Sequence, residues 1–151
     1  MRLAVVTDLD GTLCNDGHRQ HLAKAKQWDE FHGLLANDEP WQDVRNAINA
    51  LSVHFDIIAL TARNERYRTE TMAWLHRHMC SVDVLLMRPD NNFDSSEIIK
   101  ERLLAEHFGG EGASIENSVG SILCMLEDRD KVVEHWRNLG FRCWQVQPGG
   151  Y

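Results

Sequence analysis

Short apolar runs alternate along the chain with segments of helical periodicity. Each run is five or six residues long, consists mainly of apolar residues, and is followed by polar or turn-forming residues. The runs occupy residues 3–7, 55–60, 82–87, 121–126 and 141–146. Short, mainly apolar runs of this kind are typical of strands that are buried on both faces of a parallel sheet. The sequence therefore predicts five strands.

Between these runs, apolar residues recur three or four positions apart, which predicts amphipathic helices. The expected helices cover residues 40–51, 64–79, 95–108 and a segment around 132–139. For the second of them we expect an inner face of Tyr67, Met72, Trp74 and Leu75. Alternating strands and helices predict an α/β fold: one Rossmann-like domain with a five-stranded, mostly parallel sheet and helices on both faces.

Residues 15–38 interrupt this alternation directly after the first strand. The segment is polar, with helical spacing from Leu22 to Leu35, so we expect a small helical insert that resembles a cap. Trp28 and Phe31 in the insert, and Trp41 after it, could stack on a nucleobase, as aromatic residues do in single-strand binders. Their helical spacing favours core packing for at least two of the three.

Composition narrows the class of protein. A length of 151 residues and a hydrophobic content of 43% suit one folded domain, numbered 1–151. The net charge of −7 argues against broad binding of duplex nucleic acid, although 12 Arg against 4 Lys keep small anionic ligands possible. Apolar runs are too short for a membrane span, and the four cysteines form no CxxC pair. We expect a cytoplasmic protein with reduced thiols, no signal peptide and no membrane association.

Polar residues follow several predicted strands at the point where each strand ends. In open α/β sheets, ligands bind beyond the carboxyl ends of the strands, so these residues are expected to share one edge. Acids, a hydroxyl group and an ammonium group together suit a hard cation and a phosphoryl group. The residues concerned are Asp8, Asp10, Thr61, Arg63, Lys100, Glu127 and Asp128.

The segment Asp8-Leu9-Asp10-Gly11-Thr12-Leu13 resembles the first motif of the haloacid dehalogenase superfamily of phosphohydrolases. Thr61, Lys100 and Glu127-Asp128 match its later motifs in order. Residues 127–146 further resemble the 3′-phosphatase domain of phage-type polynucleotide kinase-phosphatases. Arg19 and Arg63 of this chain match positions at which that family has arginines for the substrate phosphate. No GxxxxGK[ST] motif occurs, so we expect no kinase domain within these 151 residues. Two departures from the family pattern are Ser96, four residues before the motif Lys, and Glu127 in place of Asp.

The resemblance implies a role for each of these residues. Asp8 is the expected nucleophile and Asp10 the expected general acid and base, while Thr61 and Lys100 stabilise the transferring phosphoryl group. Arg19 and Arg63 are expected to bind the substrate phosphate. The cofactor is expected to be Mg²⁺, with the Asp8 carboxylate, the Asp10 carbonyl and Asp128 as direct ligands and Glu127 acting through water.

The expected function is a Mg²⁺-dependent phosphomonoesterase that removes a 3′-phosphate from a nucleic acid end or a nucleotide. A 5′-nucleotidase or a general small-molecule phosphatase stays open as the alternative. A receiver-like domain with a stable phospho-Asp is a weaker one, since its acceptor Asp would end the middle strand, where this chain has Met87-Arg88. The sequence leaves the oligomeric state open.

Overall fold

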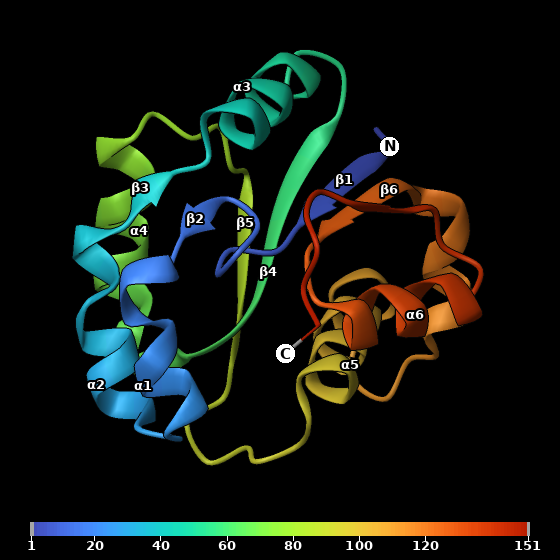
Figure 1. Cartoon of the computed structure of the whole chain (residues 1–151). Coiled ribbons are helices and arrows are strands. Elements are labelled where there is room, and N and C mark those ends of the chain that lie inside the picture. The colour runs from blue at the N-terminus through green and yellow to red at the C-terminus, as the bar shows by residue number, and fades with distance from the viewer. Residues whose placement is uncertain (1, 151) are drawn as a thin grey trace.

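The computed structural model describes residues 2–150 and contains one five-stranded sheet in which every pairing is parallel (Figure 1). The strand order is β5-β4-β1-β6-β7. The bounds are Ala4–Thr7 for β1, Asp56–Asn64 for β4, Val84–Arg88 for β5, Ile122–Glu127 for β6 and Cys143–Gln145 for β7. The α/β prediction and the five-stranded parallel sheet are confirmed.

The central strand β1 sets the position of the functional edge. Thr7 lies opposite Ala59 of β4 on one side and Leu126 of β6 on the other. The residues one or two positions beyond these three therefore lie at the same edge of the sheet. Asp8, Thr61 and Glu127 are brought together by this register.

Two helices cover each face of the sheet (Figure 1). One face carries α3 (Gln42–Leu51) and α4 (Arg68–Arg77), and the other carries α5 (Ser96–Gly109) and α6 (Asp130–Asn138). The single-turn 3-10 helix η3 (Glu65–Tyr67) leads into α4, and the longer 3-10 helix η4 (Ile115–Ser121) leads into β6. The limits of the four long helices lie within four residues of those expected from the hydrophobic period.

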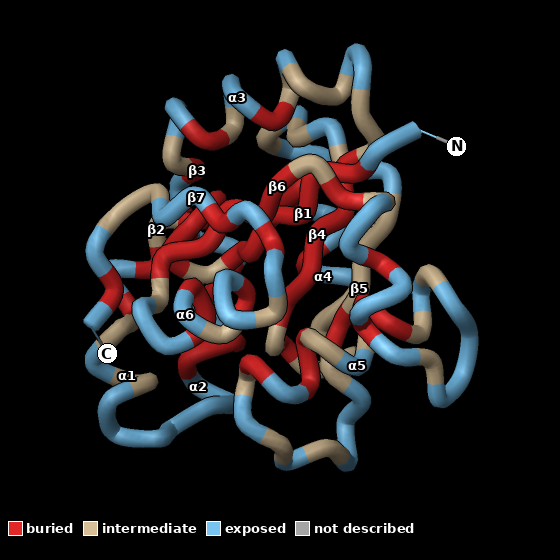
Figure 2. The backbone as a smooth tube through the Cα atoms, turned by 90° about the vertical axis from the view of Figure 1, so that its right-hand side faces the viewer, coloured by how far each residue is buried: buried red, intermediate tan, exposed pale blue. Residues whose placement is uncertain are grey.

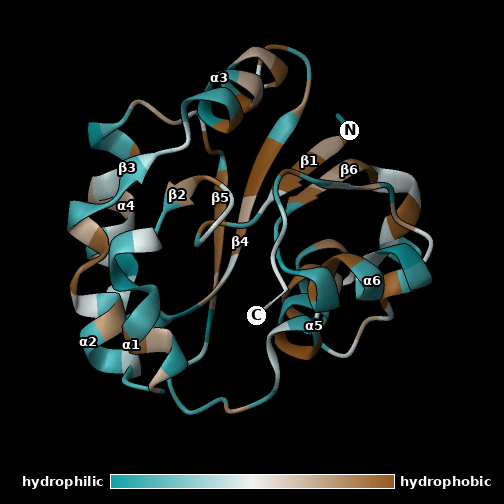
Figure 3. Cartoon of the chain, in the orientation of Figure 1, coloured by the Kyte–Doolittle hydropathy of each residue, from teal (hydrophilic) through white to brown (hydrophobic). Residues whose placement is uncertain are grey.

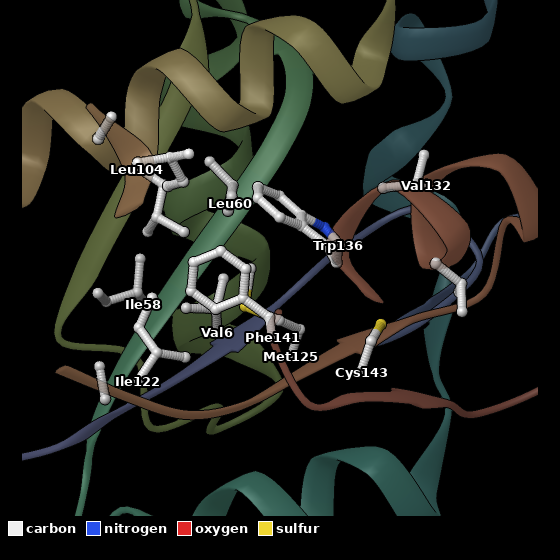
Figure 4. Close-up of a cluster of buried hydrophobic side chains, with 14 residues drawn as sticks. Val6, Ile58, Leu60, Leu104, Ile122, Met125, Val132, Trp136, Phe141 and Cys143 are labelled. Atoms are coloured by element: carbon white, nitrogen blue, oxygen red, sulfur yellow. The ribbon is translucent and has the colours of Figure 1, made fainter. Parts of the chain in front are cut away.

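The core has two halves, separated by the sheet. Val6 packs in the α5/α6 half with Leu104, Trp136 and Phe141, as Figure 4 shows, whereas Val5 packs in the α3/α4 half with Trp74. Neighbouring residues of a strand point to opposite faces, so β1 contributes to both halves and is buried throughout. Buried segments accordingly run through the centre of the molecule in Figure 2.

The segment after β1 forms the expected insert, with α1 (Gln20–Lys24) and α2 (Trp28–Gly33) flanked by the turns η1 (Gly17–Arg19) and η2 (Leu35–Asn37). Lys26 lies between these two helices and has a φ of 57°, a left-handed backbone conformation that interrupts the helical segment. A two-stranded antiparallel sheet of β2 (Cys14–Asn15) and β3 (Glu39–Pro40) closes the insert at its base. The sequence did not indicate this pair of strands, because two-residue strands carry no periodicity.

Some expected side-chain positions are wrong or refined. The sequence predicts Met72 on the inner face of its helix, and this prediction is wrong. Met72 is 55% exposed, because that face consists of Thr71, Trp74 and Leu75. Phe31 is buried and Trp41 packs against the core, whereas Trp28 is 52% exposed. Core packing therefore accounts for two of the three aromatic residues, as expected.

The hydropathy of the residues differs between the sheet and the insert (Figure 3). Hydrophobic residues concentrate in β1, β4 and β6, while α1 and α2 are largely hydrophilic.

Within residues 2–150, no helix combines the length and apolar character that crossing a membrane requires. All four cysteines are free thiols.

Candidate active site

A buried lysine lies at the centre of the candidate site. The Lys100 ammonium donates to Asp8 Oδ1 at 2.8 Å and to Glu127 Oε2 at 2.7 Å, and its side chain is 4% exposed. Lys100 comes from the second turn of α5, Asp8 from the end of β1 and Glu127 from the end of β6. Three separate chain segments thus meet in one charged cluster. The change from Asp to Ser96 does not leave Lys100 unsupported, since two carboxylates hold it.

The loop after β1 turns back tightly enough to place a second polar group here. The amides of Thr12 and Leu13 both donate to the Leu9 carbonyl, at 3.1 and 3.0 Å, and Gly11 has a φ of 84° that suits glycine. The Thr12 hydroxyl consequently lies 3.1 Å from Asp128 Oδ1 and 3.3 Å from Asp8 Oδ2. The hydroxyl group therefore lies between the two carboxylates, and either of them can accept its single proton in a hydrogen bond.

Burial and the neighbouring Glu127 carboxylate together raise the pKa of Asp8 to about 7, although Lys100 acts in the opposite direction. Burial also disfavours the charged form of Lys100. The two carboxylates outweigh this effect and hold the pKa of Lys100 above its ordinary value. The lysine is therefore a fixed positive charge, while Asp8 shares its site with a proton near neutral pH.

Three of the predicted metal ligands form one group of hard donors. Carboxylate oxygens of Asp8, Glu127 and Asp128 all lie within 4.8 Å of one another, and all three residues are buried. Mg²⁺ prefers oxygen ligands, so the donor set fits this ion. The carboxylate of Asp10 is not a member of the group, and the predicted ligand from that residue, its carbonyl oxygen, stays a prediction.

The C-terminal segment packs against the loop that carries Asp128. The Asp130 amide donates to the Gly149 carbonyl at 2.8 Å, and Gln145 Nε2 donates to the Asp128 carbonyl at 2.8 Å. The Gln147 side chain donates to the carbonyl of Gly11 in the other acidic loop. A Cβ atom on Gly149 would lie 2.2 Å from the Asp128 carbonyl oxygen, so only glycine permits this approach. The segment therefore supports both acidic loops from outside.

Asp10 lies between two arginines. Arg19 Nη2 donates to Asp10 Oδ1 at 2.5 Å, and Arg63 Nη2 donates to the same oxygen at 2.7 Å. The Arg63 Nε group lies 3.0 Å from Asp10 Oδ2, so this guanidinium binds both carboxylate oxygens. Burial opposes ionisation of Asp10, but the positive charges of Arg63 and Arg19 outweigh it and hold the pKa of Asp10 well below its usual range.

Neither arginine is exposed. The side chains of Arg19 and Arg63 have 0% exposure, whereas that of Asp10 has 19%. The remaining donors of Arg19 reach Asp38 and the Phe31 carbonyl, and Arg63 Nη1 reaches the Thr71 hydroxyl. Contact of either guanidinium with a substrate phosphate, as the resemblance implied, would require these bonds to rearrange. That role stays a prediction.

Thr61 also lies at this edge, fully buried at the end of the regular pairing of β4 with β5. Its Oγ1 accepts a hydrogen bond from the Arg63 amide at 3.1 Å. The strand pairing then shifts between Thr61 and Asn64. Beyond Thr61, the same strand carries Arg63, whose guanidinium binds Asp10.

Two buried acids near the site were not found from the sequence. Asp38 is 1% exposed and binds Arg19. Asp16 is 5% exposed, and burial together with the negative charge of Asp10 raises the pKa of Asp16 to about 7. Both residues belong to the polar insert, where Asp and Asn are common turn formers, so no local pattern marked them.

Comparison with known proteins gives one match to a family model. Residues 2–151 match the family described as the polynucleotide kinase PNKP phosphatase domain. No curated protein matches the chain.

Solved structures also resemble the chain. Two are chains of a Pnkp1/Rnl/Hen1 RNA repair complex, both with 27% sequence identity over the whole of this chain and with TM-scores of 0.79 and 0.81. The present chain spans 44% and 48% of their lengths. A haloacid dehalogenase-like hydrolase from Streptococcus pneumoniae shares the fold at 10% identity and a TM-score of 0.64, with 99% of this chain and 94% of that chain covered.

The family match covers nearly the whole chain, and the parallel sheet and the acidic edge around Asp8 and Lys100 agree with it. The chain therefore belongs to the family of polynucleotide kinase phosphatase domains, and is a phosphatase of the haloacid dehalogenase type.

Proposed function

We propose that the chain is a Mg²⁺-dependent phosphomonoesterase that acts through an aspartyl-phosphate on Asp8. The observation that carries this proposal is the cluster at the end of β1, in which Lys100 bridges Asp8 and Glu127 beside Asp128. A carboxylate held next to a fixed ammonium group and further acids suits in-line attack on a phosphate whose charge must be neutralised.

In the first step, the Asp8 carboxylate attacks phosphorus and the bond from phosphorus to the leaving oxygen breaks. The leaving oxygen takes a proton from the carboxyl group of Asp10. In the resting arrangement the two arginines favour the ionised form of Asp10. The arriving phosphate dianion adds negative charge beside Asp10, which favours the protonated form that this step requires.

In the second step, water attacks phosphorus and its proton passes to the Asp10 carboxylate. The bond between phosphorus and Asp8 breaks, and inorganic phosphate leaves. Lys100 and Thr61 stabilise the oxygens of the transferring group in both steps. The Asp8 carboxylate, the Asp10 carbonyl, Asp128 and, through water, Glu127 would hold Mg²⁺, which would supply charge neutralisation when bound.

For the substrate, we propose a 3′-phosphate at a nucleic acid end or on a nucleotide. Membership of the polynucleotide kinase phosphatase family and the 27% identity to chains of an RNA repair complex support this class. A terminal phosphate needs only a few cations, which is compatible with a net charge of −7. The four free thiols support a reducing, cytoplasmic compartment.

A side-by-side comparison of kcat/KM tests this substrate assignment. The panel contains a 3′-phosphorylated oligonucleotide, a 3′-nucleotide, a 5′-mononucleotide, a 5′-phosphorylated oligonucleotide, a sugar phosphate and an aryl phosphate. An Asp8→Asn preparation, purified in parallel, reports any contaminating phosphatase. We expect the 3′-phosphorylated substrates to lead by tenfold or more. If 5′-mononucleotides lead by that margin, the 3′ assignment is wrong and the chain is a nucleotidase.

A further inference from the structure

The best-connected polar group outside the Asp8 cluster is a buried set of two acids and two arginines, which we call the arginine clamp. Its members are Asp10, Arg19, Arg63 and Asp38. Arg19 belongs to the insert and Arg63 to β4, while Asp38 directly precedes β3 and Asp10 follows β1. The clamp therefore joins the insert to the edge of the sheet.

Asp38 binds Arg19 and lies close to Arg63. Arg19 donates to both of its oxygens, from Nε at 2.8 Å and from Nη2 at 2.5 Å, and Arg63 Nη2 lies 3.8 Å from it. Asp38 is itself fixed, because the Trp74 indole N–H donates to its backbone carbonyl at 2.8 Å and the His18 ring lies 2.7 Å from Oδ1. A bidentate pair of this kind sets the plane of the guanidinium as well as its position.

Each arginine is also held by contacts besides the two acids. The guanidinium carbon of Arg19 lies 4.1 Å from the centre of the Phe31 ring, and Arg19 Nη1 donates to the Phe31 carbonyl at 3.2 Å. Arg63 Nη1 donates to the Thr71 hydroxyl at 3.2 Å. Every guanidinium nitrogen of the two arginines donates to a group inside the protein, and neither side chain has exposed surface, so both guanidinium groups face Asp10 rather than solvent.

We infer that Asp38 is a positioning residue for catalysis: through Arg19, with Arg63 alongside, it fixes the carboxylate of Asp10 relative to Asp8. Asp10 is the only clamp member whose side chain retains exposure, at 19%, so it is the member that a substrate can reach. Small displacements of a proton-transferring group slow a reaction strongly, by up to about a hundredfold for 1 Å. This inference rests on the proposed acid and base role of Asp10.

The test variant is Asp38→Asn, which keeps the shape of the side chain and removes its charge. Asp29→Asn is the matched control, because Asp29 also lies in the insert and binds an arginine, Arg66 at 2.7 Å, but its side chain is 70% exposed. Two phosphate esters are compared: p-nitrophenyl phosphate, whose leaving group needs little protonation, and an alkyl phosphate, whose leaving group needs a proton. Inhibition by orthophosphate reports binding of the phosphate group separately.

We expect Asp38→Asn to lower kcat/KM for the alkyl phosphate by about ten- to a hundredfold and for the aryl phosphate by clearly less. The inhibition constant of orthophosphate should stay within about twofold, and Asp29→Asn should behave as the unaltered protein. A weakened orthophosphate affinity with equal losses for both esters would show instead that the arginines bind phosphate directly. Equal losses at unchanged orthophosphate affinity would also overturn the inference, since a general loss of structure does not distinguish leaving groups.

Two further variants separate the possible failures. If Asp10→Asn retains activity toward the alkyl phosphate, the acid and base role in the proposed function fails. If Asp10→Asn is inactive while Asp38→Asn is normal, only the positioning role fails. Should Asp38→Asn not fold, Arg19→Lys asks the same question, because it keeps the positive charge but loses the bidentate geometry. The same selective loss for the alkyl ester is then expected, and its absence overturns the inference.

Discussion

Replacing Lys100 by methionine removes the charge at the centre of the acidic cluster with little change in volume. In the unaltered protein the ammonium group is buried and pairs with Asp8 and Glu127 at 2.8 and 2.7 Å. In the absence of metal, the substitution leaves two buried carboxylates without their cation. Removing one partner of a buried ion pair costs about 3–5 kcal/mol of unfolding free energy. We expect a loss of this size at pH 8.

The loss should shrink as the pH falls. Asp8 already has a pKa of about 7 with Lys100 present, and removing the ammonium group raises that value further. An acid whose pKa is higher in the folded than in the unfolded state takes up a proton preferentially in the folded state. Its contribution to stability is therefore lost as the pH rises from about 4 through the folded-state pKa. The variant should accordingly be closest to the unaltered protein near pH 5.

Urea unfolding in EDTA at pH 5 and pH 8 measures both effects. Lys131→Met is the matched control, because Lys131 also pairs with a glutamate, Glu97 at 2.9 Å, but has a side chain that is 64% exposed. An exposed pair contributes about 1 kcal/mol or less, so the control should lie near the unaltered protein at both pH values. A change of less than about 1 kcal/mol for Lys100→Met at pH 8 would refute the view that this lysine neutralises two buried carboxylates.

Three further predictions concern the proposed chemistry and substrate. Asp8→Asn should abolish hydrolysis of an aryl phosphate and the labelled phosphoprotein recovered after acid quenching; a labelled intermediate in the variant would assign the nucleophile elsewhere. Mg²⁺ competes with a proton at Asp8, so the rise in melting temperature on adding Mg²⁺ should grow from pH 5.5 to about 7 and then level off; a shift independent of pH would contradict Asp8 as a ligand. Trp28→Ala should raise KM for a 3′-phosphorylated oligonucleotide but not for an aryl phosphate, if Trp28 stacks on a base. Trp144→Ala, which alters a tryptophan of matched exposure on β7 (51% against 52%), should change neither, and equal effects of the two would exclude a specific role.

The sheet could be predicted from the sequence because its strands are buried on both faces. The runs around Val5, Ile58 and Met125 are continuously apolar, and this pattern depends on burial alone. Helix faces were less certain: Met72 is apolar but lies beside the inner face rather than on it. The pairing of β2 with β3 was not predictable, since it joins the two ends of the insert and follows from no local pattern.

Part of the candidate site could likewise be predicted from the sequence, and part could not. Asp8 and Glu127 lie at the ends of strands, and Lys100 lies near the start of a helix, whose positions the sequence predicts, so their convergence follows from parallel topology. Asp38 lies in an irregular segment, and only the folded insert brings it to Arg19. Motif position suggested that Arg19 and Arg63 face the substrate, whereas the direction of a long side chain depends on the charges around it, here those of Asp10 and Asp38.

The central place of β1 in the sheet has a consequence for the order in which the chain can fold. Its first partner, β4, follows within the first half of the chain, but its second partner, β6, pairs Cys124 with Val5. Pairings between residues so distant in sequence form slowly, because closing a long loop costs entropy before contacts repay it. Until β6 has been synthesised, one edge of β1 has exposed backbone groups and an apolar surface, the condition that favours pairing with other chains. The strand that bears Asp8 therefore depends on the last third of the chain for protection from aggregation as well as for Glu127 and Asp128.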